Sequence, residues 1–468
     1  MKSNRKITTL ILIILAIISP IYFDNPRFNV KNSDITLNHN DIFNHTNLKI
    51  STFSEKIHID NNWTAAKAVG LCTGNGTYSE PYIIKDLVID GDGAESCILI
   101  EYSEVFFKIE NCNVFNSYFG IRLTNTKNAR ILNNTCSSNK ISGISLSHSN
   151  NNNISGNIAN SNDFHGISLF YSDMNNISEN IEQDNSNYGI SLYDSDNNLI
   201  LNNIINSGIE LGGIYNNLSG NLMNKCGLRI SHSNTMNFYY QNIDITNLIN
   251  GKSLYYYTNE QDLGPNNFTN AGQIIMASCS NSLVTNLNLS YSDTGLTLIN
   301  CDDIIITRNS INNNRRDGIY IFGGDNNTIS ENSVSYNNHN GVFLELNTNN
   351  SFLENNISYN DFNGFYCYSL ENSFISGNDI NHNQKYGIYF INCKKNMIRG
   401  NLLIGNEKCF NEEYSEDNVF ENNECRDRTS SIPGYNLFLL LGILSILAII
   451  LNKKIKKSSF KTIFIKCD

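Results

Sequence analysis

The stretch that decides the fold is GISLSHSNNNNISGNIANSNDFHGISL, residues 143–169, in which Gly-Ile-Ser-Leu begins at Gly143 and returns 23 residues later at Gly166. A glycine recurs every 23 residues in two separate blocks of the chain. These glycines are Gly120, Gly143, Gly166 and Gly189, followed by Gly272, Gly295, Gly318, Gly341, Gly364 and Gly387. Such regular self-similarity indicates a repeat architecture.

A second marker runs in phase with the first, because an asparagine follows 14 residues after each glycine. Cys97 and Asn111 hold the same two positions in one further upstream copy. Chance does not keep two markers in register over ten copies. The asparagines are Asn134, Asn157, Asn180 and Asn203, then Asn286, Asn309, Asn332, Asn355, Asn378 and Asn401.

The pattern inside one copy is that of short strands. Apolar and polar positions alternate in Gly-Ile-x-Leu, which is the period of a half-buried strand, and Asn-x-Ile-x-x-Asn gives a second strand. A unit of this size cannot bury a face by itself, so successive units must stack. We therefore predict an all-β fold, a parallel β-helix of about 14 coils, each coil advancing by roughly 4.8 Å.

Asparagine makes up 84 of the 468 residues. It disfavours helices and favours turns, which agrees with a coil that turns every few residues. A side-chain amide has two donors and one acceptor. Asparagines at the same turn of successive coils can therefore bond to one another, and we expect such ladders along the coil.

The repeat is disturbed between Gly189 and Gly272, and residues 242–271 are irregular. We interpret residues 242–271 as a loop excursion from the coil. Loops of repeat scaffolds often carry function, although an insertion without consequence is an equal alternative.

The ends of the chain differ from its middle. Lys2, Arg5 and Lys6 precede an apolar run, as in a secretory signal, and residues 437–451 form a second apolar run before a lysine cluster. We expect a membrane protein with an extracellular β-helix and a cytoplasmic tail. The acidic middle of this chain, whose overall formal charge is −11, argues against a nucleic-acid partner.

The expected domain organisation follows from these features. It is a signal peptide or signal anchor at 1–23, an N-terminal segment and cap at 24–96, the β-helix at 97–425, a linker at 426–436, a transmembrane helix at 437–451 and a basic tail at 452–468.

Between residues 57 and 425 the repeat resembles right-handed parallel β-helix proteins of the NosD-like, pectin-lyase-like group, and this resemblance implies the handedness. The Gly-Lys-Ser-Leu-Tyr-Tyr-Tyr run at 251–257 is similar to an element of NosD-like proteins. Residues 57–93 resemble the leading segment of archaeal surface β-helix proteins. Ile432-Pro433-Gly434-Tyr435 resembles archaeal C-terminal sorting signals, with tyrosine in place of phenylalanine.

A search for catalytic and metal-binding residues gives little. Four aspartates share one register, seven residues after their glycines, and stacked carboxylates could hold calcium, although Asx-turns are the more common role of such residues. Arg315, Arg316 and Asp317 cluster without an acid pair in register, and His and Met are scattered, which disfavours copper. We assign no catalytic residue, no metal and no cofactor. The four aspartates are Asp173, Asp196, Asp302 and Asp325.

One surface feature stands out. The outward position of Gly-x-x-x is aromatic in four successive later coils, so we predict an exposed aromatic stripe. Such a row suits stacking on sugars or docking of a protein; it can also simply stabilise the sheet or lie under a loop. The predicted ligand-binding residues are Tyr320, Phe343, Tyr366 and Tyr389.

The first functional expectation is a membrane-anchored surface module that binds polysaccharide or surface glycans, or that is purely structural. The alternatives are a calcium-dependent polysaccharide lyase or a glycoside hydrolase, and, from the resemblance, a NosD-like accessory protein for a copper site.

Overall fold

The computed structural model describes residues 52–231 and 235–428, which belong to one compact unit. The predicted signal segment at 1–23 and the predicted transmembrane helix at 437–451 lie outside the described residues. Across 52–231 and 235–428, no helix has the length and apolar character needed to cross a membrane.

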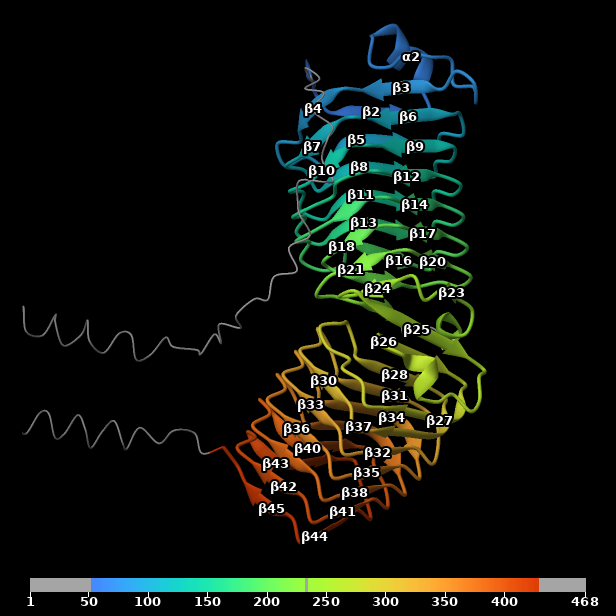
Figure 1. Ribbon diagram of the computed structural model, residues 1–468. Helices are drawn as coiled ribbons and strands as arrows, with labels where there is room; N and C mark the ends of the chain where they lie inside the picture. The colour runs from blue at the N-terminus through green and yellow to red at the C-terminus, as the bar shows by residue number, and fades with distance from the viewer. Residues whose placement is uncertain (1–51, 232–234, 429–468) are drawn as a thin grey trace, which may run out of the picture. The chain divides into compact units, whose positions relative to one another are not determined.

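The described chain is a parallel β-solenoid of about 15 turns (Figure 1). It begins earlier than predicted, because β2 (Ile57–Asp60) already pairs with β5 (Ser96–Glu101) in parallel. Helices are short: α2 (Trp63–Ala68), η2 (Thr235–Phe238) and η3 (Pro265–Phe268).

We call residues 52–249 the N-terminal coils. Each coil contributes to three sheets, whose strands pair in parallel with the coil before and the coil after. The first sheet runs β2, β5, β8 (Phe119–Thr124), β11 (Ser142–Ser147), β13 (His165–Phe170), β16 (Ile190–Tyr193), β19 (Ile209–Leu211) and β22 (Leu228–Ile230). The second runs β3 (Tyr82–Lys85), β6 (Phe107–Glu110), β9 (Ala129–Leu132), β12 (Asn153–Ser155), β14 (Asn176–Ser178), β17 (Leu199–Leu201), β20 (Asn217–Ser219) and β23 (Asn242–Ile243).

The third face of the N-terminal coils has shorter strands. Single bridges from Thr135 to Ile158 and from Ile158 to Ile181 connect its two parts. Its strands are β1 (Thr52–Phe53), β4 (Leu87–Asp90), β7 (Asn113–Phe115) and β10 (Thr135–Cys136), followed by β15 (Ile181–Glu182), β18 (Ile204–Ile205), β21 (Leu222–Met223) and β24 (Leu248–Ile249).

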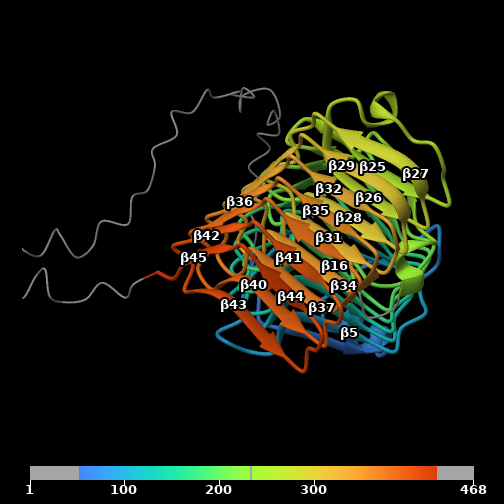
Figure 2. The same cartoon turned by 90° about the horizontal axis from the view of Figure 1, so that it is seen from below.

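We call residues 252–426 the C-terminal coils, which Figure 2 shows from below. One face continues the sheet of β24 with β25 (Lys252–Thr258), β26 (Ala271–Ala277), β28 (Leu296–Ile299), β31 (Ile319–Phe322), β34 (Val342–Thr348), β37 (Phe365–Glu371), β40 (Tyr386–Ile391) and β43 (Lys408–Glu413). The next has β27 (Ser280–Thr285), β29 (Asp302–Thr307), β32 (Thr328–Ser330), β35 (Ser351–Leu353), β38 (Phe374–Ser376), β41 (Met397–Arg399) and β44 (Val419–Glu421). The last has β30 (Ser310–Asn312), β33 (Ser333–Ser335), β36 (Asn356–Ser358), β39 (Asp379–Asn381), β42 (Leu402–Ile404) and β45 (Glu424–Arg426).

The irregular residues 242–271 are built into the sheets instead of forming an open loop. β24 and β25 form an antiparallel pair, and β25 then pairs with β26 in parallel. In the N-terminal coils this sheet holds the third strand of each coil. After the antiparallel pair, the same sheet holds the first strand of each C-terminal coil, which is the strand at the repeated glycine.

The expected asparagine ladders are present at the inner corners. Asn157 Oδ1 accepts the backbone N–H of Asn134 at 2.9 Å and its side-chain amide at 3.0 Å, and Asn157 makes the same bonds to Asn180. The marker fails at Asn111 and Asn286, because the following coil step is 22 residues. The backbone N–H groups of Cys112 and Leu287 therefore donate the ladder bond instead, to Asn134 and Asn309.

The repeated glycines are required by close approach between coils. A Cβ on Gly318 would lie 2.4 Å from Val334 Cγ1 and 2.7 Å from the carbonyl oxygen of Gly341. The glycine therefore lets the neighbouring coil and its ladder asparagine come within bonding distance, and any larger residue would push them apart.

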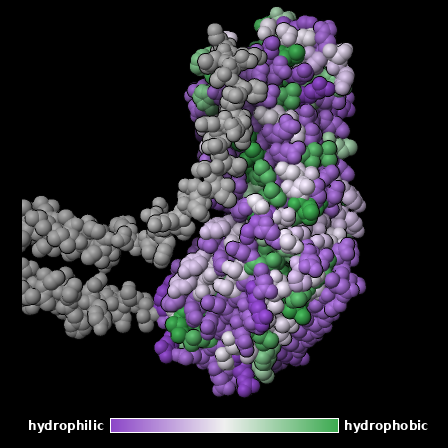
Figure 3. Space-filling model, in the orientation of Figure 1, coloured by the Kyte–Doolittle hydropathy of each residue, from purple (hydrophilic) through white to green (hydrophobic). Residues whose placement is uncertain are grey.

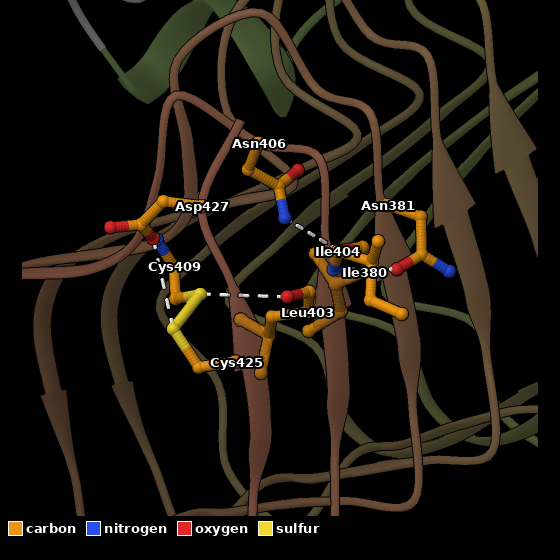
Figure 4. The surroundings of a disulfide bond; sticks show 8 residues. All are labelled: Ile380, Asn381, Leu403, Ile404, Asn406, Cys409, Cys425 and Asp427. Carbon is orange, nitrogen blue, oxygen red and sulfur yellow. Dashed lines mark hydrogen bonds between the residues drawn. A yellow bond between two sulfur atoms is a disulfide. The ribbon is translucent and has the colours of Figure 1, made fainter. Parts of the chain in front are cut away.

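Both ends of the described solenoid carry additional contacts. At the start, Trp63 of α2 stacks on Tyr82 with ring centroids 4.9 Å apart. At the end, a disulfide joins Cys409 of β43 to Cys425 of β45, two segments of the final coil (Figure 4). A covalent link here limits fraying of the last coil that the structure describes, which pairs with no later coil among the described residues.

The surface on the face drawn in Figure 3 is mainly hydrophilic, with small separate hydrophobic groups. The apolar side chains lie inside the coils, where columns of Ile, Leu, Val and Phe stack in register.

Replacing one ladder asparagine should be costly. In Asn332→Ala, the buried N–H groups of Asn309 lose their acceptor, and the side-chain bond from Asn332 Nδ2 to Asn355 Oδ1 is lost. We expect a fall of about 3 kcal/mol in the free energy of unfolding, because buried polar groups lose partners. Urea denaturation measures this. Exposed Asn338, in the same coil, is the control, and an equal effect of Asn338→Ala would contradict the ladder's role.

Glu182 allows a second test. It is fully buried in an otherwise apolar column next to Ile205. Neither of its carboxylate oxygens has a hydrogen-bond partner among the described residues. Burial raises the pKa of Glu182 well above its ordinary value of 4.5. The folded protein therefore keeps the proton while the unfolded chain loses it above that value, so this residue lowers stability as pH rises. Glu182→Met should add about 2 kcal/mol at pH 7 and less at pH 4. Equal gains at both pH values in thermal denaturation would contradict this.

Candidate functional site

The four predicted aromatic residues form one column on the sheet of the C-terminal coils. Tyr320 of β31 pairs with Phe343 of β34, Phe343 with Tyr366 of β37, and Tyr366 with Tyr389 of β40. The ring centroids of successive members are 5.1, 5.0 and 5.4 Å apart. We call this column the aromatic ladder.

The exposure of the ladder differs from the prediction of a uniformly exposed stripe. Tyr320 is buried, with 4 % of its surface exposed, whereas Phe343, Tyr366 and Tyr389 are half-buried. Tyr320 belongs to the apolar cluster of the N-terminal coils, which cover this end of the sheet. The ladder therefore emerges from under that cover and becomes accessible toward Tyr389.

Two tyrosine hydroxyls of the ladder are hydrogen-bonded to carboxylates of neighbouring strands. Tyr320 donates to Glu345 Oε2 at 3.1 Å, and Tyr389 donates to Glu413 Oε1 at 2.8 Å. Burial and the bond to Glu413 raise the pKa of Tyr389 to about 12. The ring positions are thus fixed and uncharged at physiological pH, as a stacking surface requires.

A second column runs beside the ladder, at the turn that precedes each of these strands. The backbone N–H of each member donates to the carbonyl of the member one coil earlier, at 2.8 to 3.2 Å. We call it the polar column, and its members are Asp293, Arg316, His339, Phe362 and Lys385.

The two columns enclose two adjoining cavities, which share His339. The outer cavity has a volume of about 460 Å³ and is lined by Tyr366, Tyr389 and Lys385, among others. The inner cavity, about 260 Å³, is lined by Tyr320 and by the first members of the polar column. Together they form a groove along the C-terminal coils.

His339 is held in one orientation at the point where the cavities meet. Its Nδ1 lies 2.7 Å from Asp317 Oδ1, and the backbone N–H of Asn340 donates to the same oxygen at 2.9 Å. A carboxylate at Nδ1 favours the tautomer that carries its proton there, which leaves Nε2 as a base. The His339 ring also packs on Phe362, with centroids 4.6 Å apart.

Charged groups lie deep in the inner cavity. Asp293 is buried, and its Oδ1 has no hydrogen-bond partner among the described residues, although Arg316 Nε lies 3.6 Å away. Burial raises the pKa of Asp293, and nearby Arg316 and Arg229 oppose that shift. Arg229 itself is paired with Glu210 at 3.2 Å.

Sequence reasoning noticed Arg316 and Asp317 but missed their partners. Asp293, Arg316 and His339 are each 23 residues apart, so the repeat already placed them in one column. Arg229 could not be found in this way, because it belongs to the N-terminal coils and reaches the site only through the junction of the two sets of coils.

The four stacked aspartates have structural roles. Asp173 Oδ1 accepts the backbone N–H of Asp196, and Asp302 Oδ1 accepts that of Asp325, both at 2.8 Å. Each pair therefore ties one turn to the next, as Asx-type bonds do.

Two family profiles match the chain. The profile described as periplasmic copper-binding protein (NosD) matches residues 73–253, and the profile of the right handed beta helix region matches residues 207–369 and 324–436. With the parallel solenoid, these matches show that the chain is a right-handed β-helix repeat protein. No curated protein sequence matches it.

Solved structures of similar fold include three carbohydrate-active proteins. The periplasmic alginate epimerase AlgG is 12% identical over 80% of this chain and 84% of its own, with a TM-score of 0.29. The mannuronan C-5 epimerase AlgE6 A-module of Azotobacter vinelandii is 12% identical over 78% and 93%, with a TM-score of 0.30. The catalytic domain of a GH87 α-1,3-glucanase is 12% identical over 80% and 61%, with a TM-score of 0.26. These values are too low to transfer any activity.

The described residues do not fit the copper site that the NosD name implies. The cysteines within 73–253 are buried thiols, and burial raises the pKa of Cys112 to about 11 and of Cys226 to about 12, whereas a cysteine binds copper as the thiolate. Within the described ranges, the one set of three His, Cys, Asp or Glu groups close enough to share an ion is Cys409, Cys425 and Asp427. Its two sulfurs are joined in a disulfide.

Proposed function

We propose that the groove between the aromatic ladder and the polar column binds a glycan, and that the protein serves as a surface-exposed, membrane-anchored β-helix. The observation that carries the first part is the run of half-buried rings Phe343, Tyr366 and Tyr389, spaced at about 5 Å. Phe343 lines the inner cavity and the two tyrosines line the outer one, with groups of the polar column on the other wall. Aromatic faces with adjacent hydrogen-bonding groups suit the alternating apolar and polar faces of sugars.

The anchoring and the extracellular placement rest on the sequence at the two ends of the chain. The Cys409–Cys425 disulfide supports the extracellular placement, because such bonds persist in oxidising compartments. Accessibility of an epitope within 97–425 on intact cells, together with recovery of the protein in the membrane fraction, tests this placement.

Binding of the full chain to alginate, homogalacturonan, xylan, mannan, chitin and cellulose tests the glycan site. Tyr366→Ala and Tyr389→Ala should each weaken binding about fivefold, since each removes one stacking surface worth about 1 kcal/mol. Affinity electrophoresis and pull-down on the insoluble polymers measure the change.

The matched controls are Phe170→Ala and Tyr193→Ala. These exposed rings also stack, with centroids 5.0 Å apart, but they lie in the N-terminal coils and line neither cavity. Loss of binding in the controls with retention in Tyr366→Ala would move the site elsewhere. No binding to any polymer would leave a purely structural role in the cell envelope.

A second candidate is hydrolysis of the bound glycan. The observation favouring it is the His339–Asp317 pair, which presents Nε2 as a base at the groove, with the buried carboxyl of Asp293 lining the same cavity. His339 could activate water as a base, and the carboxyl of Asp293 could protonate the leaving oxygen. A calcium-dependent lyase is less well supported, because the stacked aspartates are engaged with the backbone.

Release of new reducing ends from the polymers above measures hydrolysis. His339→Asn and Asp293→Asn should each lower the release of reducing ends at least 100-fold, while glycan affinity changes less than fivefold. The control His382→Asn alters a histidine that stacks on Tyr359 and lines neither cavity. Binding without any product release would exclude this candidate and leave the binding function standing.

A further inference from the structure

The groove is closed at one end. The register of the aromatic ladder continues beyond Tyr320 to Thr297 and then to Ile275. These three residues are buried, with 4 %, 6 % and 1 % of their surfaces exposed, whereas the ladder is half-buried from Phe343 onward. The outer face of this sheet is thus covered before Tyr320 and open after it.

The cover is the last described strand of the first sheet of the N-terminal coils. Leu228 and Ile230 of β22, with Phe238 of η2, pack in one apolar cluster with Ile275 and Tyr320. Two hydrogen bonds to the Gln273 side chain fix this contact: the backbone N–H of Leu228 donates to Gln273 Oε1 at 2.9 Å, and the carbonyl of Leu228 accepts from Gln273 Nε2 at 2.7 Å.

Further polar contacts hold the junction. The Arg315 guanidinium lies over the Tyr188 ring, 4.8 Å from its centroid, and donates to the carbonyl of Ser207. Asn300 Nδ2 donates to the Tyr239 hydroxyl at 2.6 Å. The wall at the closed end is therefore packed and hydrogen-bonded on several sides.

We infer that the groove recognises the end of a glycan chain: the terminal sugar enters the inner cavity, and the following sugars lie over Phe343, Tyr366 and Tyr389. This inference rests on the proposed glycan-binding function. A continuing polymer cannot pass the wall formed by Leu228, Ile230 and Phe238.

The size and chemistry of the inner cavity agree with one terminal sugar. Its 260 Å³ is below the roughly 300–1,000 Å³ typical of pockets for drug-sized ligands. Arg316, His339 and the buried carboxyl of Asp293 line it, and these groups can hydrogen-bond to the hydroxyls of a terminal sugar, including the one that a glycosidic bond replaces in internal sugars.

Binding by the unaltered full chain gives the first test. Each polymer that binds in the panel is partly hydrolysed with mild acid, and the fragments compete with immobilised polymer at equal mass. End recognition predicts that a tenfold rise in the number of chain ends lowers the half-inhibitory mass concentration about tenfold. A constant or rising half-inhibitory mass concentration would overturn the inference while leaving glycan binding intact. Absence of binding to every polymer would instead defeat the proposed function itself.

A cavity-filling variant gives the second test. Thr294 is half-buried and lines the inner cavity but is not part of the ladder, so Thr294→Trp should fill that space. We expect at least a tenfold loss of affinity for the fragments. We also expect the dependence on chain ends to disappear, whereas Tyr389→Ala should lower affinity yet keep that dependence.

The control for this variant is Thr307→Trp, at a half-buried threonine on the sheet of β29. Thermal denaturation confirms that both variants fold. An unchanged dependence on chain ends in folded Thr294→Trp would overturn the inference, and a loss of that dependence in Thr307→Trp would overturn it as well.

Discussion

The rest of the structure depends on one hydrogen bond, from the backbone N–H of a corner residue to the side-chain oxygen of the asparagine one coil later. It fixes the register between coils and satisfies buried polar groups that have no water nearby. The bond tolerates unequal coils, since Asn203 reaches Asn221 after 18 residues and Asn221 reaches Asn247 after 26. The corner is therefore conserved in space even where the repeat is lost in the sequence.

Register has a functional consequence, because it turns a periodic sequence into columns of like side chains. The aromatic ladder and the polar column are two such columns on neighbouring positions of the same coils, about 5 Å per step. A groove between them needs no special loop. The closed end of the groove, in contrast, depends on the antiparallel pair of β24 and β25. After this pair, the sheet that formed the third face of the N-terminal coils continues as the first face of the C-terminal coils.

Much of the fold and part of the site follow from the sequence. The glycine and asparagine markers predict the stacked strands, and the positions of Tyr320, Phe343, Tyr366 and Tyr389 follow from the same spacing. The 23-residue spacing of Asp293, Arg316 and His339 likewise places these residues in one column. The sequence-based prediction missed this column because it looked for paired carboxylates, whereas the column combines acidic and basic residues. The burial of Tyr320 and the position of Arg229 at the inner cavity could not be predicted from the sequence, because both arise where segments distant in the chain meet.

The sequence by itself determined the coil, its inward asparagines and the alignment of side chains one repeat apart, because these depend on local alternation and on contacts between neighbouring repeats. Only the tertiary structure decided that residues 242–271 exchange the faces of the solenoid, and that the N-terminal coils cover one end of the aromatic ladder. Those outcomes depend on packing between residues more than 40 positions apart, such as Leu228 and Gln273, and no periodic pattern encodes such a contact.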